Sequence, residues 1–155
     1  MAIANPIRVY ADTSVFGGCF DAEFMKASRL FFDEVRGGRI RLVVSDTTAL
    51  ELIEAPDAVR RVLTDLSPSV VERILLNEEI ESLRDAYLAH GVVGRAAQRD
   101  AEHIAAATIA DADMIVSWNF KHIVHYEKIS GYQGVNLLEG YNAIRIFSPL
   151  EVIDA

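Results

Sequence analysis

The sequence has only one cysteine, Cys19, among its 155 residues. A single thiol cannot form an intramolecular disulfide, and it excludes a zinc cage built from several cysteines. The longest apolar stretch, residues 104–110, contains Thr108 and is far shorter than the ~20 residues that a membrane-spanning helix needs. The chain begins MAIANPIRVYADTS, which lacks the basic start and long apolar segment of a secretory signal. These absences predict a cytoplasmic protein with no membrane partner.

Positive charge is also scarce. The chain has 15 basic and 23 acidic residues, a formal net charge of −8, and an isoelectric point near 4.9. A protein that coats a nucleic-acid duplex is normally basic, so this balance argues against broad electrostatic binding to nucleic acid. It leaves room for a small cleft in which bound cations reverse the local sign of charge.

The chain has only four prolines and nine glycines, and no Pro/Gly-rich linker, low-complexity tract or internal repeat divides it. Residues 1–155 are therefore predicted to form one domain, which at this length can bury a substantial core. Hydrophobic residues make up 51% and charged residues 25% of the chain, a balance that excludes a disordered protein.

Short β-favouring segments alternate with amphipathic ones along the sequence. Strands are predicted over residues 7–11, 40–44, 114–117 and 143–147, and helices over 24–36, 47–54, 57–66, 77–89 and 99–110. Residues 70–76 fit either a strand or a helix, and the pair Gly17-Gly18 is predicted to break the chain after the first strand. The alternation predicts an α/β protein with a mainly parallel sheet and helices on both faces.

Polar residues stand where several of these elements end or begin. Asp12 and Ser117 lie at strand ends, Glu51 lies early in a predicted helix, and Asp100 lies at a helix start. Each carboxylate has a plain structural interpretation by itself: a turn for Asp12, a favourable helix start for Asp100, and a solvated helix position for Glu51. Ligand sites of parallel sheets lie beyond the carboxyl ends of the strands, so together the three predict a cluster there.

Clustered carboxylates repel one another and persist best around a cation. Ligation by oxygen alone favours Mg²⁺ or Mn²⁺ over zinc, and Mg²⁺ keeps coordination positions for water and substrate phosphate. Such a centre suits hydrolysis of a phosphodiester, because the metal activates water and neutralises charge on the phosphate. No serine, cysteine or histidine nucleophile is needed.

Four blocks of the sequence resemble the PIN-domain nucleases, especially the VapC-type toxins of type II toxin–antitoxin systems. The blocks are YADTSV at residues 10–15, SDTTALEL at 45–52, DAEHIAAA at 100–107 and ADMIVSWNF at 112–120. Each block is weakly specific alone, but the four occur in family order and at family-like spacing across nearly the whole chain.

The resemblance implies a three-layer α/β/α sandwich and Mg²⁺- or Mn²⁺-dependent cleavage of single-stranded RNA. It implies that Asp12, Glu51 and Asp100 hold the metal, and that Thr13 and Ser117 orient the ligands or a water. It also implies a homodimer that a cognate antitoxin protein holds inactive.

The chain departs from the common family pattern at Asn119, where many members have a fourth acid. Asn119 can still offer a carbonyl oxygen as a metal ligand, but it carries no charge, which leaves open whether one metal or two bind. Two hypotheses follow. The chain is a metal-dependent ribonuclease that acts as a toxin, or it is a catalytically weak PIN-like domain that binds RNA or protein. A phosphatase-type α/β domain fits less well, because the D-x-D-x-T strand end of that class is absent.

Three other residues flank the predicted site. Trp118 can stack on a base or serve the core, and Lys121 can contact substrate phosphates or remain a solvated loop charge. His103 lies one turn after Asp100 and can donate a hydrogen bond to the site or pack against the sheet, and packing is the preferred interpretation.

Overall fold

The computed structural model describes residues 5–153 and contains a five-stranded, all-parallel sheet in the order β3-β2-β1-β4-β5. The strands are β1 (Ile7–Ala11), β2 (Ile40–Ser45), β3 (Val71–Ile74), β4 (Met114–Val116) and β5 (Arg145–Phe147). β1 lies at the centre, where Tyr10 pairs with Val43 of β2 on one side and Ile115 of β4 on the other. Because all strands run the same way, their carboxyl ends meet at one edge of the sheet.

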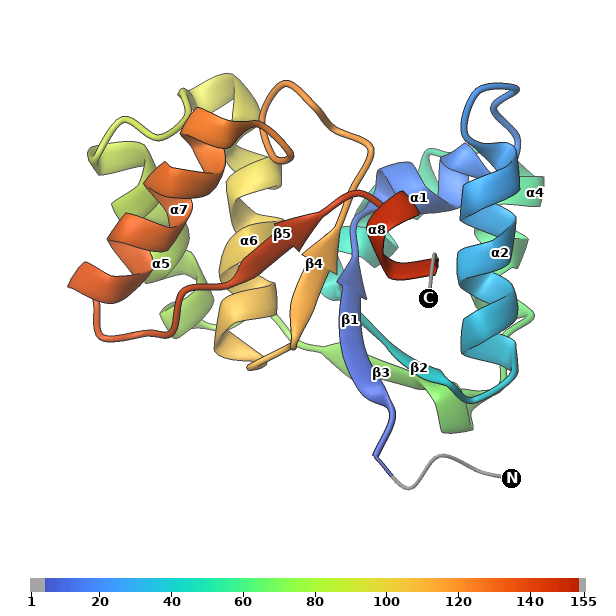
Figure 1. Ribbon diagram of the computed structural model, residues 1–155. Helices are drawn as coiled ribbons and strands as arrows, with labels where there is room; N and C mark the ends of the chain where they lie inside the picture. Colours follow the sequence, from blue (N-terminus) through green and yellow to red (C-terminus); the bar gives the residue numbers. More distant parts are fainter. Residues whose placement is uncertain (1–4, 154–155) are drawn as a thin grey trace.

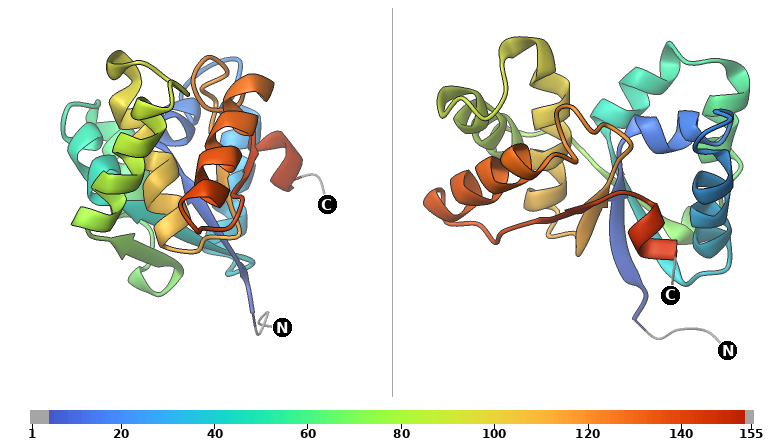
Figure 2. Two further views of the ribbon diagram at one scale, coloured as in Figure 1. Left: turned by 90° about the vertical axis from the view of Figure 1, so that its left-hand side faces the viewer. Right: turned by 45° about the horizontal axis from the view of Figure 1, so that its top comes forward.

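Helices cover both faces of the sheet, so the protein is an α/β sandwich of three layers (Figures 1 and 2). Within residues 5–153 the α-helices are α1 (Thr13–Gly18), α2 (Met25–Arg36), α3 (Asp46–Ile53), α4 (Asp57–Thr64), α5 (Glu78–Ala89), α6 (Gln98–Ile109), α7 (Tyr126–Leu138) and α8 (Leu150–Ile153). Helices α5, α6 and α7 pack on one face, and α1, α2, α4 and α8 on the other.

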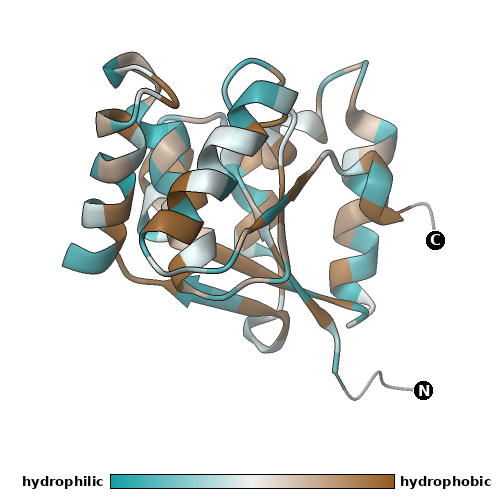
Figure 3. Cartoon of the chain, turned by 60° about the vertical axis from the view of Figure 1, so that its left-hand side comes forward, coloured by the Kyte–Doolittle hydropathy of each residue, from teal (hydrophilic) through white to brown (hydrophobic). Residues whose placement is uncertain are grey.

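Alternate residues of each strand enter the two cores. On β1, the side chain of Tyr10 lies with the α5–α6–α7 core, whereas those of Val9 and Ala11 lie with the core beneath α1 and α2. This alternation is the two-residue period of a strand. Both faces are apolar, which explains why the central strands read as continuous hydrophobic runs. Figure 3 shows hydrophilic and hydrophobic residues mixed along the outer helices, as expected for elements with one buried side.

The predicted α/β class with a parallel sheet is confirmed. Residues 70–76, for which the sequence left strand and helix as alternatives, contain the edge strand β3. The chain does not break at Gly17-Gly18 as the sequence predicted. Both glycines belong to α1, a short helix that follows β1 directly. Glycine is required at position 18 by packing: a Cβ there would overlap Ser28 Oγ and lie 2.8 Å from Trp118 Nε1.

This packing predicts opposite effects at the two neighbouring glycines. Gly18→Ala should lower the free energy of unfolding by about 1–3 kcal/mol, because overpacking displaces neighbouring groups. It forces apart Trp118 Nε1 and Ser28 Oγ, which share a 2.8 Å hydrogen bond. Gly17→Ala meets nothing within 4 Å and should raise the free energy of unfolding by about 0.4–1 kcal/mol. Urea unfolding followed by Trp118 fluorescence measures both, and equal effects would contradict the packing argument.

Within residues 5–153, no helix has the length and apolar character needed to cross a membrane.

Candidate functional site

Three carboxylates approach one another at the carboxyl end of the sheet. Asp12 directly follows β1, Glu51 lies on α3 after β2, and Asp100 lies in the first turn of α6. Burial is the main cause that raises the pKa of both Asp12 and Asp100. The negative charge of Asp100 adds to the rise at Asp12, and that of Glu51 adds to the rise at Asp100. The three side chains therefore form one electrostatically coupled cluster.

Asp12 is the most buried member of the cluster, with 4% of its surface exposed. Its Oδ1 accepts a hydrogen bond of 2.5 Å from Ser14 Oγ, and its Oδ2 accepts one of 2.7 Å from Ser117 Oγ. No basic side chain of residues 5–153 forms an ion pair with it. Asp12 is thus a buried carboxylate whose hydrogen bonds come from neutral hydroxyls, and the nearby charge of His103 only partly offsets the rise in its pKa that burial causes.

Glu51 has a cationic partner in His103. Its Oε1 accepts hydrogen bonds from Thr13 Oγ1 at 2.7 Å and from His103 Nε2 at 2.5 Å. The other ring nitrogen of His103 lies 2.7 Å from the Tyr10 hydroxyl, which lies 2.6 Å from Ser45 Oγ. The sequence placed His103 in the packing against the sheet, and the side chain is indeed buried, yet it also bonds directly to the site.

The charges of Glu51 and His103 stabilise each other. Burial by itself would raise the pKa of Glu51, but the hydrogen bond and positive charge of His103 outweigh it and lower this pKa. Burial likewise opposes protonation of His103, but Tyr10 and Glu51 outweigh it and raise the pKa of the imidazole. The imidazolium form donates from both ring nitrogens, to Glu51 and to the Tyr10 oxygen.

A second buried contact fixes α3 against α6. Thr47 Oγ1 donates to Glu102 Oε1 at 2.5 Å, and Arg84 Nη1 of α5 donates to Glu102 Oε2 at 2.6 Å. Glu51 lies four residues after Thr47 and therefore on the same side of α3. The contact thus holds Glu51 near the first turn of α6, where Asp100 lies.

Asn119 lies beside Asp100, and its side chain helps to lower the pKa that burial raises there. Its carbonyl oxygen is already engaged, because Oδ1 accepts hydrogen bonds from the backbone N–H groups of Lys121 at 3.1 Å and His122 at 2.9 Å. In this conformation Asn119 shapes its own loop and presents its amide group, rather than a free oxygen, to the cluster.

Basic side chains lie around the acidic cluster. Arg99 lowers the pKa of Glu51, and His122 lowers that of Asp100, although burial is the largest influence on both carboxylates. Arg99 and Lys121 are exposed, and neither forms an ion pair with residues 5–153. Both are therefore free to meet an anionic ligand at this edge.

The donor set suits a hard divalent cation. Each carboxylate oxygen has two lone pairs, so Asp12 retains acceptor capacity after its two hydroxyl contacts. Carboxylate oxygens are the ligands that Mg²⁺ and Mn²⁺ prefer. Within the described part of the chain, no group of three or more His, Cys, Asp or Glu side chains is arranged around a common metal position. The oxygens of Asp12 instead accept hydrogen bonds from Ser14 and Ser117, and Oε1 of Glu51 accepts them from Thr13 and His103.

The structure brings together all six residues singled out from the sequence as site residues, with Thr13 bonded to Glu51 and Ser117 to Asp12. Sequence reasoning missed Ser14, which bonds Asp12 and accepts a 2.9 Å hydrogen bond from the Trp118 backbone N–H. The sequence feature that could have identified Ser14 is its position two residues after Asp12. Because a chain break was expected at Gly17-Gly18, helix α1 was not predicted, and α1 is the element that turns Ser14 toward Asp12.

Cys19 takes no part in this chemistry. Its thiol is 4% exposed, and burial raises its pKa to about 11. The thiolate is the nucleophilic form of cysteine, so we expect the folded protein to react very slowly with Ellman's reagent at neutral pH. The same protein should react completely in guanidinium chloride. Rapid reaction of the folded protein would contradict this burial.

In comparisons with known proteins, no protein-family model and no curated protein matches the chain.

Proposed function

We propose that the protein is a metal-dependent ribonuclease that hydrolyses phosphodiester bonds of single-stranded RNA. The observation that carries the proposal is Asp12, a carboxylate 4% exposed with hydroxyl partners only, next to two further carboxylates. A buried charge of this kind is unfavourable without a compensating cation. A cation bound among the three acids would remove that cost.

Each residue has a defined role in this proposal. Asp12, Glu51 and Asp100 would hold Mg²⁺ or Mn²⁺. A bound divalent ion lowers the pKa of a water nucleophile and neutralises charge on a phosphate. Ser117 and Thr13 fix the orientation of Asp12 and Glu51 through hydrogen bonds of 2.7 Å each, which limits the freedom of the ligands.

Exposed cations at the same edge would bind the RNA backbone. Arg99 directly precedes Asp100 and Lys121 lies two residues after Asn119, and both are exposed, so both can contact phosphates. With a formal net charge of −8, the rest of the protein repels RNA. Binding would therefore be confined to this edge, and it would weaken as salt rises.

The PIN-domain resemblance extends the proposal to partners. It suggests that the protein is a cytoplasmic toxin of the VapC type, that it forms a homodimer, and that a cognate antitoxin protein inhibits it. These assignments follow from the four sequence blocks. Co-purification with the product of a neighbouring gene, and loss of growth inhibition when both are expressed, would test them.

Calorimetric titration of the protein with Mg²⁺ and Mn²⁺, beside RNA cleavage assays on the same samples, tests the central proposal. We expect metal binding, cleavage of single-stranded RNA, loss of cleavage with EDTA and its return with excess Mn²⁺. Absence of metal binding under all these conditions would refute the proposal.

Asn119 favours a second candidate, a PIN-like domain that binds RNA or protein with little turnover. Its Oδ1 is taken up by two backbone N–H groups, and His103 already supplies a cation to Glu51. This candidate predicts RNA binding that is unchanged by EDTA and no metal-dependent turnover. Robust cleavage that EDTA abolishes would reject it.

A further inference from the structure

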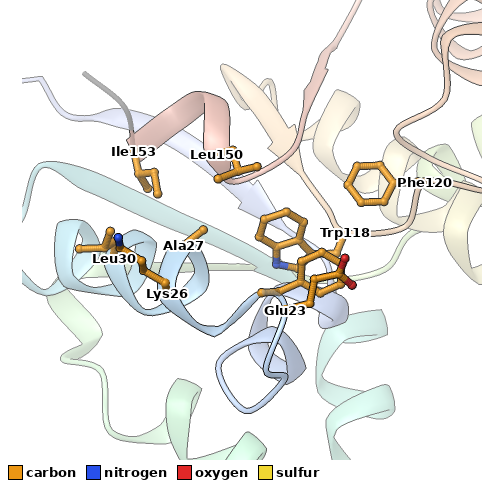
Figure 4. A pocket seen from close by; sticks show the side chains of 9 residues that line it. Glu23, Lys26, Ala27, Leu30, Trp118, Phe120, Leu150 and Ile153 are labelled. Carbon is orange, nitrogen blue, oxygen red and sulfur yellow. The ribbon is translucent and has the colours of Figure 1, made fainter.

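An apolar groove of about 520 Å³ lies beside the candidate site, between α2, α8 and the segment that follows β4 (Figure 4). Its volume is within the ~300–1,000 Å³ range of small-molecule sites. Trp118 and Phe120 form its wall on the side of the site, and Leu30, Leu150 and Ile153 line the opposite side. Glu23 and Lys26 supply its charged side chains.

The groove and the acidic cluster share one short segment of backbone. Along residues 117–120, alternate side chains serve different purposes. Ser117 bonds Asp12 and Asn119 lies beside Asp100, whereas Trp118 and Phe120 line the groove. A chain molecule that crosses this segment can therefore contact the carboxylates and the groove at adjacent positions.

The aromatic wall is rigid at one end and accessible at the other. Trp118 stacks on Phe24 with ring centroids 4.3 Å apart and donates a 2.8 Å hydrogen bond from Nε1 to Ser28 Oγ. Phe120 packs against Trp118 with centroids 6.2 Å apart, in an edge-on arrangement, and is 48% exposed. The ring of Phe120 thus presents an open aromatic surface beside a fixed one.

We infer that this groove binds an unpaired nucleobase of the RNA, stacked on Phe120, next to the nucleotide that is cleaved. The inference rests on the proposed ribonuclease function. Aromatic side chains that flank a backbone-binding site bind single-stranded nucleic acid by stacking, with little dependence on base identity. The groove supplies that surface directly beside the carboxylates.

The charges at the groove match a nucleotide. Lys26 at the groove and Lys121 directly after Phe120 are both exposed, and neither forms an ion pair with the described residues. They can contact the phosphates on either side of a stacked base. The carboxylate of Glu23 can accept hydrogen bonds from the amino groups on a base edge. An entirely apolar ligand would leave all three charges unmatched.

Trp118 is the only tryptophan in the chain, so its fluorescence reports directly on the groove. We would titrate the protein in EDTA, where no cleavage occurs, with a mixed-sequence RNA tetranucleotide. The same tetranucleotide with abasic central positions and an amphipathic Leu/Lys helical peptide serve as alternative ligands. We expect the RNA to quench Trp118 and the abasic form to bind about fivefold to 100-fold more weakly.

Variants of the wall sharpen the test. Phe120→Ala should weaken RNA binding by the same factor, and Phe120→Tyr should preserve it because the aromatic ring remains. Leu138→Ala, at an exposed residue at the end of α7, should leave binding unchanged. Equal binding of the RNA and its abasic form, or quenching by the peptide but not by RNA, would overturn the inference. The latter result would identify a protein-docking groove.

Cleavage assays on the same samples in Mn²⁺ separate the two proposals. Cleavage without any RNA-dependent quenching would refute the base site and leave the ribonuclease assignment intact. Base-dependent quenching without cleavage in Mg²⁺ or Mn²⁺ would support the base site and refute the ribonuclease assignment.

Discussion

Replacing Asp12 with asparagine is expected to reduce metal-dependent RNA cleavage about 10³-fold or more while making the metal-free protein more stable. Loss of a central carboxylate removes several kcal/mol of metal and transition-state stabilisation. The amide oxygen of the variant can accept a hydrogen bond from one of the two hydroxyls, Ser14 or Ser117, and its NH2 group can donate to the other hydroxyl oxygen, so the local structure should persist. Calorimetry with Mn²⁺ should show loss of metal binding in parallel with the loss of cleavage.

The stability gain follows from the direction of the Asp12 pKa shift. Burial raises this pKa, so the charged carboxylate is less favourable in the folded than in the unfolded protein. The stability that Asp12 contributes when protonated is lost as pH rises through its folded pKa. The advantage of Asp12→Asn should therefore be greatest at neutral pH and shrink toward acid pH. Urea unfolding in EDTA measures it.

Asp65→Asn is the matched control for this variant, because Asp65 is exposed and lies outside the cluster. It should change neither cleavage nor stability by a measurable amount. Persistent cleavage in Asp12→Asn would remove Asp12 from the catalytic centre. A less stable Asp12→Asn protein would contradict the account of Asp12 as an unfavourable buried charge.

Replacing His103 with alanine is expected to lower the free energy of unfolding by about 3 kcal/mol, because removal of one member of a buried ion pair leaves the other without compensation. The side chain of His103 is 2% exposed and that of Glu51 is 23% exposed. The variant also leaves the buried Tyr10 hydroxyl without its contact to the ring. His90→Ala, at an exposed histidine at the end of α5, should change stability by less than about 0.5 kcal/mol.

The effect of His103→Ala should depend on pH in a defined direction. The pKa of His103 is raised well above its ordinary value, so its contribution is fully present below about pH 6.5, the unfolded value. That contribution is lost as pH rises through the folded pKa. The Glu51 pKa is lowered, so its contribution is present above about pH 4.3, the unfolded value, and is lost as pH falls through the folded pKa.

The stability difference between the protein and His103→Ala should thus be largest between these limits and decline on the alkaline side. Urea unfolding in EDTA at about pH 5.5 and about pH 9.5 measures the difference. A difference that does not change with pH would contradict an ion pair between His103 and Glu51.

The layered fold could be predicted from the sequence because the central strands and amphipathic helices carry strong periodic patterns. The edge strand β3 was ambiguous because its sequence VERI has two charged residues in four positions, which gives no apolar run. Helix α1 was missed because a glycine pair ordinarily ends regular structure. Position 18 instead requires glycine because Trp118, which is far away in the sequence, leaves no room for a Cβ. A local sequence pattern carries no information about such a distant contact.

The site shows the same division between local and distant information. Asp12, Asp100 and Ser117 stand at element ends that the sequence predicts, and Glu51 lies within the predicted helix after the second strand, so their convergence follows from a parallel sheet. The hydrogen bond between His103 and Glu51 joins residues 52 positions apart. The apolar periodicity of α6 predicts only that His103 is buried, so it does not indicate this bond. The engagement of Asn119 Oδ1 depends on the exact course of a loop, which residue identity does not specify.

The strand order also has a consequence for when activity can arise during synthesis. β1 lies at the centre and pairs with β2 soon after it, but its other neighbour, β4, comes after a long excursion through β3, α5 and α6. Asp12 receives its hydrogen bond from Ser117 across 105 residues of chain.

At about 5–20 residues per second, a ribosome needs several seconds to supply that distant partner. Until then one side of β1 remains unpaired, Asp12 lacks its hydrogen bond from Ser117, and the groove wall of Trp118 and Phe120 has not been made. Under the proposed function, a nascent chain could not cleave RNA until about three-quarters of it had been made, because Ser117 is residue 117 of 155, so the topology itself would delay the activity.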